Sequence, residues 1–298
     1  MTDVSRRAAR SIVELAHAVV VDAAAAVGVP VLVLKGLGAQ HHGLQPAERV
    51  PADVDVLVPP HAAAAVTREL ERRGWRRRPA DADDLTFSRH SETLYRSGWS
   101  CDLDVHERFP GLGPDTEEVF RRLWSTRSTI VVAGVGVPVP GRDEAVLVHA
   151  LHCLRSLAVR RHVEELDQLV EDAHGLSGAA VVAVARDLGA LPAARPFLTR
   201  AFGVELDDWG VPDLRWRLLT AVESPMARRL LAFLEASWRD RLRVFAAAVV
   251  PPRETLGKHT LDPLGPRRLI AAYLRRLRRG VRLLPAALRE ADRARRRW

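Results

Sequence analysis

Two segments in the first third of the chain alternate apolar and polar residues, a pattern that predicts β-strands with one buried face. Residues 53–58 carry valine at every second position, and Asp53 and Asp55 share the opposite face. Residues 100–106 repeat the pattern, with Cys101 on the apolar face. The polar face of this second strand consists of Asp102, Asp104 and His106. Each strand therefore carries carboxylates on the side opposite to its apolar residues.

Further periodic segments surround these strands. We expect strands at residues 31–34, 75–78, 85–88 and 93–96, helices at residues 5–27, 37–44, 62–73 and 117–124, and a hairpin at residues 130–139. From residue 143 onward the pattern is helical, with helices expected at residues 143–159, 162–174 and 179–188. The pattern predicts an α+β fold, in which a mixed sheet with helices is followed by a mostly helical C-terminal half.

The positive charge is concentrated at the C-terminal end. The chain has a formal net charge of +8, whereas residues 264–298 hold 12 arginines and two acids, so the preceding 263 residues sum to −2. We expect two basic helices, at residues 267–279 and 283–297. This tail would bind RNA through phosphate contacts, lie on an anionic membrane surface, or pack on the rest of the chain with its arginines solvated.

Cysteine usage and hydropathy indicate a cytoplasmic protein. Cys101 and Cys153 do not make a disulfide framework, and the sequence has no Cys/His spacing typical of zinc sites. The N-terminal apolar run is interrupted by Glu14, His17 and Asp22, which predicts an amphipathic helix rather than a signal peptide. No uninterrupted apolar segment is long enough to span a membrane.

The acidic pair Asp53 and Asp55 indicates a metal site. Like charges on one face of a strand repel, and Mg²⁺ relieves this repulsion because it binds carboxylate oxygens and completes its shell with substrate phosphates. Lys35 supports this interpretation, because Lys35 and Lys258 are the chain's two lysines among 45 basic residues. A lysine between an apolar strand and Gly36 favours a compact charge that binds phosphate.

A third carboxylate on the later strand would complete the site. Asp104 is favoured over Asp102, which also suits a solvated strand edge. Two metal ions held by three carboxylates would bind the nucleotide phosphates and the attacking hydroxyl, and the third carboxylate would act as general base. The sequence thus indicates metal-dependent phosphoryl or nucleotidyl transfer.

These motifs resemble the nucleotidyltransferase superfamily, specifically its uncharacterised nucleotidyltransferase branch. The resemblance is carried by the letters LKG, DVDVLV and LDVH and covers roughly residues 10–175. It implies that Asp53, Asp55 and Asp104 form the metal and catalytic set and that Lys35, Gly36, Arg49 and His106 bind the nucleotide. His106 suits a buried structural histidine equally well. Relatives with the Gly-Ser signature use the serine near the triphosphate, so the phosphate contacts of a Lys35-Gly36 chain must differ.

The resemblance also implies a function and a domain order. We expect a nucleotidyltransferase-like catalytic domain at residues 1–115, a helical domain flanking the cleft at residues 116–250, and an arginine-rich tail at residues 251–298. The expected reaction moves a nucleoside monophosphate from ATP or another NTP to an acceptor with Mg²⁺ or Mn²⁺ as cofactor. The acceptor stays open among a small molecule, a peptide, a protein and a tRNA end.

Two other classes of function remain open from the sequence. One is a non-catalytic nucleotidyltransferase-fold module, such as an antitoxin-like or assembly partner, and the other is an RNA-binding protein that acts through the tail. His149, His152 and Asp167 lie on the expected helices. They either face the cleft or belong to ordinary helix faces, with Asp167 paired to Arg160 or Arg161.

Overall fold

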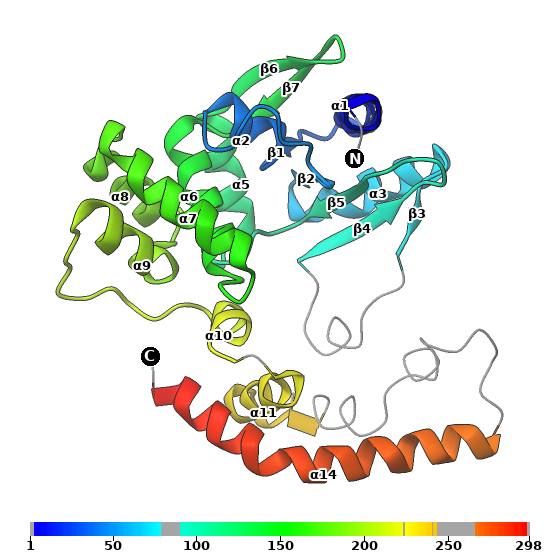
Figure 1. Ribbon diagram of the computed structural model, residues 1–298, viewed down its shortest axis with the longest axis vertical. Helices are drawn as coiled ribbons and strands as arrows, with labels where there is room; N and C mark the ends of the chain where they lie inside the picture. Colours follow the sequence, from blue (N-terminus) through cyan, green and yellow to red (C-terminus); the bar gives the residue numbers. More distant parts are fainter. Residues whose placement is uncertain (1–2, 79–89, 223, 240, 243–265, 297–298) are drawn as a thin grey trace. The chain divides into compact units, whose positions relative to one another are not determined.

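The computed structural model describes residues 3–78, 90–222, 224–239, 241–242 and 266–296, and these residues form two compact units (Figure 1). The described residues up to Pro212 belong to the first unit, and those from Asp213 onward belong to the second. The strand expected at residues 85–88 lies outside the described residues.

A mixed five-stranded sheet organises the first unit. Its strands, in the spatial order β1-β2-β5-β4-β3, are β1 (Leu32–Val33), β2 (Asp53–Leu57), β5 (Asp102–His106), β4 (Ser91–Tyr95) and β3 (Arg76–Arg77). The central strands β2 and β5 are parallel, and the other neighbours are antiparallel. The predicted mixed sheet is confirmed.

The register of β2 and β5 sorts their side chains as the alternation predicts. Asp53 pairs with Asp102 and Asp55 pairs with Asp104, so the acidic residues of both strands share one face. The intervening residues Val54, Val56, Leu103 and Val105 are at most 1% exposed and belong to one apolar core.

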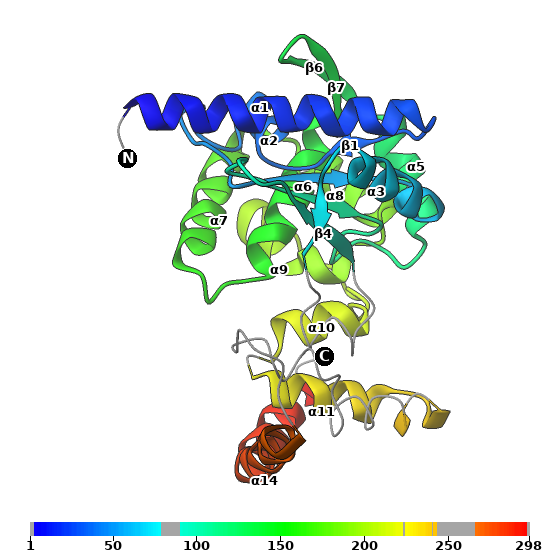
Figure 2. The ribbon, with the colours of Figure 1, turned by 90° about the vertical axis from the view of Figure 1, so that its right-hand side faces the viewer.

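Two helices cover the apolar face of the sheet. The helix α1 (Asp3–Ala26) is rich in alanine, and its apolar residues recur at the helical spacing of three or four. These residues are buried against the strands together with the apolar residues of α3 (Ala63–Arg72). Figure 2 shows α1 running lengthwise along this layer. The acidic face is left for the loops and helices that follow.

The rest of the first unit is helical apart from one hairpin. Its elements are α2 (Leu37–His41), the 3-10 turns η1 (Pro60–Ala62) and η2 (Ala173–Gly175), α5 (Thr116–Ser125), the strands β6 (Ser128–Val132) and β7 (Val135–Val139), and the helices α6 (Arg142–Leu154), α7 (Arg160–Asp172), α8 (Gly178–Asp187) and α9 (Leu191–Phe202). The expected helix at residues 143–159 ends five residues early, because residues 155–158 form turns and α7 begins at Arg160.

The described helices of the second unit pack together. They are α10 (Leu214–Thr220), α11 (Pro225–Glu235) and α14 (Pro266–Arg296). The expectation of two separate basic helices is wrong, since α14 is continuous through residues 280–282, where the break was expected, and through Pro285. A proline inside a helix costs roughly 3 kcal/mol. The small residues Ala287, Ala291 and Ala294 pack with α10 and α11 in one core, and this burial offsets the cost.

One face of α14 stays uncovered. The apolar residues concerned recur at helical spacing and are 37–65% exposed: Leu274, Leu277, Val281, Leu284 and Leu288. No described helix is long and apolar enough to cross a membrane. RNA or an anionic membrane surface as a partner of this basic helix stays a prediction.

Candidate functional site

The parallel pairing of β2 and β5 builds an acidic cluster on the open face of the sheet. Adjacent strands lie about 4.8 Å apart, so residues in register stand side by side. Ligand atoms of Asp55, Asp104 and His106 all lie within 4.8 Å of one another. This arrangement brings residues 49 positions apart in the chain into one group that could hold a metal ion.

Asp55 is the most buried carboxylate of the group. It is 4% exposed, and its Oδ1 lies 2.8 Å from Lys35 Nζ and accepts a hydrogen bond from His106 Nε2 at 2.9 Å. Burial alone would raise the pKa of Asp55, but the charge of Lys35 and the hydrogen bond from His106 hold it well below its ordinary value. Asp55 is therefore ionised throughout the physiological range.

Lys35 is positioned by the turn that follows β1. Gly36 has φ 58°, and a Cβ at this position would lie 3.1 Å from Pro51 Cγ, so glycine is required for both reasons. Lys35 is 9% exposed and its Nζ donates to His152 Nδ1 at 3.3 Å. Burial and the nearby charge of Lys35 lower the pKa of His152 to about 2, so His152 acts as a neutral acceptor.

Asp53 lies at the edge of the acidic cluster. Its side chain remains exposed although the carboxyl group is crowded by its neighbours. Desolvation and the negative charge of Asp55 raise the pKa of Asp53, and Lys35 opposes the shift. Lys35 therefore compensates the negative charge of Asp53 only in part. A cation bound at the exposed side of the site would relieve the remaining repulsion between Asp53 and Asp55.

Asp104 and Asp102 have different partners. Asp104 accepts a hydrogen bond from Thr93 Oγ1 of the neighbouring strand β4, which fixes the carboxylate on the sheet. Asp102 accepts two hydrogen bonds from the exposed guanidinium of Arg78, at 2.6 and 2.8 Å. The geometry favours Asp104 as the third carboxylate of the cluster, because Asp102 is engaged at the strand edge.

His106 lies behind Asp55 rather than at an open surface. It is 2% exposed, and its ring packs against His90 and Phe109 at centroid distances of 5.6 and 6.1 Å. Its Nδ1 has no hydrogen-bond partner among the described residues. Of the two interpretations that the sequence allows, these contacts favour a residue that positions Asp55.

Arg155, which the sequence analysis did not single out, faces the acidic cluster from the end of α6. Burial lowers the pKa of Arg155, whereas the charges of Asp55, Asp104 and Asp53 raise it. Within the described part of the chain its guanidinium makes no hydrogen bond or ion pair. Arg155 is therefore a half-buried cation near enough to the three carboxylates for their charges to act on it.

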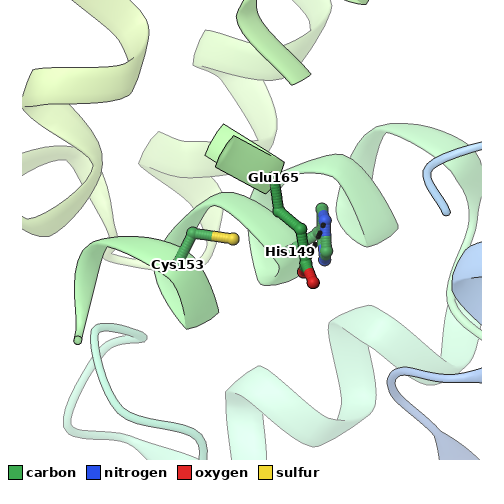
Figure 3. Close-up of side chains that lie close together, drawn as sticks. All are labelled: His149, Cys153 and Glu165. Carbon is green, nitrogen blue, oxygen red and sulfur yellow. Dashed lines mark ion pairs between the residues drawn. The ribbon is translucent and has the colours of Figure 1, made fainter. Parts of the chain in front are cut away.

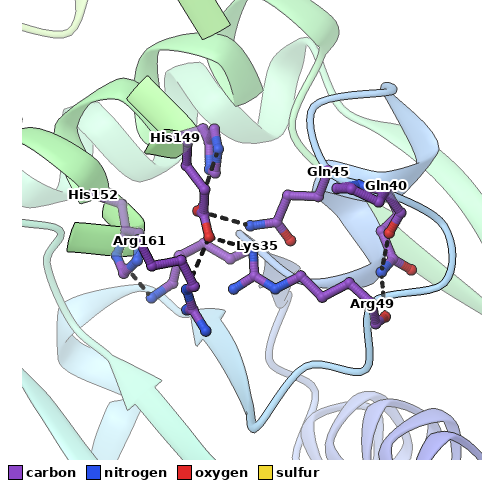
Figure 4. Close-up of polar contacts among 9 residues, drawn as sticks. Lys35, Gln40, Gln45, Arg49, His149, His152 and Arg161 are labelled. Atoms are coloured by element: carbon purple, nitrogen blue, oxygen red, sulfur yellow. Dashed lines mark hydrogen bonds and ion pairs between the residues drawn. The ribbon is translucent and has the colours of Figure 1, made fainter. Parts of the chain in front are cut away.

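A second polar network connects the loop before β2 to α7 (Figure 4). Glu165 Oε1 lies 2.8 Å from Arg49 Nη1 and 3.0 Å from Arg161 Nε, and Glu165 Oε2 accepts from Gln45 Nε2 at 3.4 Å. The backbone carbonyl of Arg49 in turn accepts from Gln40 Nε2 at 2.6 Å. Arg49 is therefore held in place by α7 and α2.

The three helical residues left open by the sequence have separate environments. His152 contacts Lys35, and His149 is 1% exposed beside Glu165, so both lie on the side of α6 that faces these polar groups. Asp167 pairs with Arg200 at 2.6 Å. The alternative in which Asp167 pairs with Arg160 or Arg161 is wrong, because these arginines pair with Glu164 and Glu165 one turn along α7.

Sequence reasoning missed Arg155, Glu165 and Thr93. Arg155 lies at a helix end that was expected inside a longer helix. Glu165 had a weak signal, since it follows Arg161 by four residues, but that spacing fits any surface ion pair. Thr93 becomes relevant only through its antiparallel register with Asp104.

A mixed sheet with an acidic cluster on two parallel central strands, flanked by a lysine and an arginine, defines a nucleotidyltransferase-like domain. The comparison with protein families agrees: the model described as "Uncharacterised nucleotidyltransferase" matches residues 5–202. The chain belongs to this family. The match covers most of the first unit and none of the described residues of the second, which begin at Asp213. No curated protein matches the chain.

Proposed function

We propose that this protein transfers a nucleoside monophosphate from an NTP to an acceptor, with release of pyrophosphate. The observation that carries the proposal is the parallel register of β2 and β5, which sets Asp55 beside Asp104, with Asp53 two residues before Asp55 on the same face. Family membership supports nucleotidyl transfer in general. The nucleotide, the acceptor and the roles below go beyond it.

The donor set fits a hard divalent cation. We assign Mg²⁺ or Mn²⁺ to Asp53, Asp55 and Asp104, because carboxylate oxygens are the ligands that these ions prefer. Burial and the negative charge of Asp55 raise the pKa of Asp53, and a bound cation would counteract both effects. The bound ion would polarise the α-phosphate and neutralise its developing charge. Since Lys35 already contacts Asp55 Oδ1, the second oxygen of Asp55 and the exposed Asp53 remain for the ion.

Asp104 is assigned as general base. The acceptor oxygen would form a bond to the α-phosphorus while the bond to the bridging oxygen breaks and pyrophosphate leaves. The proton of the acceptor hydroxyl would pass to Asp104, and the hydrogen bond from Thr93 would keep the carboxylate oriented for this transfer.

Cationic side chains are assigned to the phosphates. Arg155 has no partner among the described residues and faces the cluster, and a guanidinium binds phosphate oxygens in pairs. Lys35 would contribute its point charge, and the tight turn at Gly36 would let the backbone approach the nucleotide. Arg49 is oriented by Glu165 beside the same site. In this proposal these cationic side chains and the Gly36 turn replace the triphosphate contacts that the serine makes in relatives with the Gly-Ser signature.

The helical elements of the first unit supply part of this site. The division into a catalytic domain at residues 1–115, a flanking helical domain at residues 116–250 and a tail at residues 251–298 remains our proposal. In it, α6 carries His152 and the turn directly after α6 carries Arg155. One observation favours a second candidate, a non-catalytic binding module. The Lys35 contact already neutralises Asp55 without any ligand.

The proposal is tested by transfer of label from each α-phosphate-labelled NTP, with Mg²⁺ or Mn²⁺, to a lysate separated into small molecules, RNA and protein. The Asp53→Asn/Asp55→Asn double variant should lose transfer, and the matched control Asp102→Asn should retain it. Label in one fraction names the acceptor class. Nucleotide binding without transfer to any fraction would favour the non-catalytic module.

A further inference from the structure

A second cluster of ligating side chains lies between α6 and α7, apart from the acidic cluster. His149 and Cys153 are four residues apart on α6 and therefore share one face of the helix, and Glu165 reaches them from α7. Ligand atoms of the three residues all lie within 4.8 Å of one another. Figure 3 shows the Cys153 sulfur directed toward the His149 ring and the Glu165 carboxylate.

The buried imidazole of His149 is the observation that points to a ligand. His149 is 1% exposed, and both ring nitrogens lack a hydrogen-bond partner among the described residues. Glu165 Oε2 lies 3.7 Å from Nε2, which is too long for a hydrogen bond. A buried polar group without a partner costs about 1–3 kcal/mol, and a bound ion at this point would satisfy it.

The donor types select the ion. Thiolate, imidazole and carboxylate together suit Zn²⁺, whereas Mg²⁺ and Ca²⁺ take oxygen ligands. Zinc bonds of roughly 2.0–2.3 Å place tetrahedral ligand atoms about 3.5 Å apart. Small side-chain rotations from the present separations, at most 4.8 Å, would close such a site. Three protein ligands leave the fourth position for water.

The neighbouring cations are compatible with this ion because they contact the other oxygen of Glu165. Arg49 and Arg161 approach Oε1, whereas Oε2 is the oxygen nearest to His149. Carboxylate ligands of metal ions are commonly hydrogen-bonded by such outer groups. Binding would release the Cys153 thiol proton to solvent, which balances the charge of the new metal–sulfur bond.

We propose that His149, Cys153 and Glu165 form a zinc-class metal site that joins α6 to α7. Through Glu165 and Arg49 the same ion fixes the loop before β2. The sequence has no spacing typical of zinc sites because the third ligand comes from a different helix, 12 residues beyond Cys153.

The test uses the full chain purified without a metal-affinity tag from zinc-supplemented cells. Elemental analysis should find close to one zinc per chain after dialysis. Protein produced with cobalt should show sulfur-to-cobalt charge-transfer absorption in the near ultraviolet. Cys153→Ser should abolish this absorption, and Cys101→Ser, which changes the chain's other buried cysteine, should retain it.

Two further variants keep the result interpretable. Asp104→Asn should retain both zinc and the cobalt–sulfur absorption, because it changes the acidic cluster and leaves the buried Lys35–Asp55 pair intact. His149→Gln should lose bound zinc if Cys153→Ser fails to fold. Wild-type protein without zinc and without cobalt–sulfur absorption would overturn the proposal, as would loss of that absorption in Cys101→Ser alone.

Discussion

Lys35 Nζ lies 2.8 Å from Asp55 Oδ1, and the two side chains are 10% and 3% exposed. An ion pair this buried constrains both partners, because removal of either leaves an uncompensated charge in the interior. The pair joins the turn after β1 to the central strand β2. The pair therefore stabilises the sheet and also sets the net charge of the site.

Breaking this pair should destabilise the protein strongly. Lys35→Met or Asp55→Asn alone should lower the free energy of unfolding by about 3–5 kcal/mol. The double variant should lose clearly less than the sum, because it removes both charges. Urea unfolding measures the cycle, and the exposed pair Arg160–Glu164 serves as a control with little coupling. Additive losses at Lys35 and Asp55 would contradict the buried pairing.

Stability should fall in mild acid because of His17. This residue is fully buried in α1, and burial lowers its pKa below 6.5 although a backbone hydrogen bond to Val13 and the charges of Asp55 and Glu14 oppose the shift. Below pH 6.5 the unfolded chain therefore binds a proton that the folded chain does not. The folded state loses up to about 1.4 kcal/mol per pH unit through this group.

The variant His17→Leu isolates this contribution. Urea unfolding should be measured for both proteins at several pH values. As the pH falls below 6.5, the unfolding free energy of the wild type should decrease relative to that of the variant. A difference that stays constant over this range would show that His17 titrates alike in the folded and unfolded states.

Arg155→Met should weaken nucleotide binding without unfolding the protein. Charge-assisted hydrogen bonds contribute about 1.5–3 kcal/mol, so NTP affinity should fall roughly tenfold to a hundredfold. Calorimetry with an NTP analogue resistant to transfer measures the loss, and Arg160→Met on the exposed side of α7 is the control. Unchanged affinity would remove Arg155 from the site. No binding by wild-type protein would instead count against the proposed function.

Asp104 and Asp102, both on β5, should differ in their effect on nucleotidyl transfer. Asp104→Asn should reduce transfer to background, because it removes the proposed base and a metal ligand. Asp102→Asn should leave transfer nearly unchanged, because Asp102 is engaged by the exposed Arg78. Rates for both variants under saturating NTP decide the point. Comparable losses in the two variants would mean that the third carboxylate was assigned wrongly.

Local alternation was enough to predict the two central strands and the acidic face of each. Valine at every second position forces Asp53 and Asp55 to one side, and the same reasoning places Asp104 with His106. The order of strands and the register of β2 with β5 depend on contacts between distant segments, so periodicity could not give them. The expectation that these strands meet came from the chemistry of a metal site held by three carboxylates.

The partners of the site residues were beyond the sequence. Alternation gives the face of a side chain but not the neighbour it meets, so the contacts of Lys35 with Asp55 and His152 emerged only from the fold. Arg155 was hidden because turn residues after α6 carry no strong breaking signal. The continuous α14 shows the same limit. The sequence predicted a break at residues 280–282, and the packing of Ala287, Ala291 and Ala294 against distant helices is not visible in local periodicity.

The central claim is tested most directly by parallel incubations with NTP labelled at the α-phosphate or at the γ-phosphate. The account predicts α-label on the acceptor and γ-label in released pyrophosphate, with both lost in Asp53→Asn/Asp55→Asn. Transfer of γ-label to the acceptor would identify a phosphotransferase and contradict the account. So would α-label transfer that persists in the double variant.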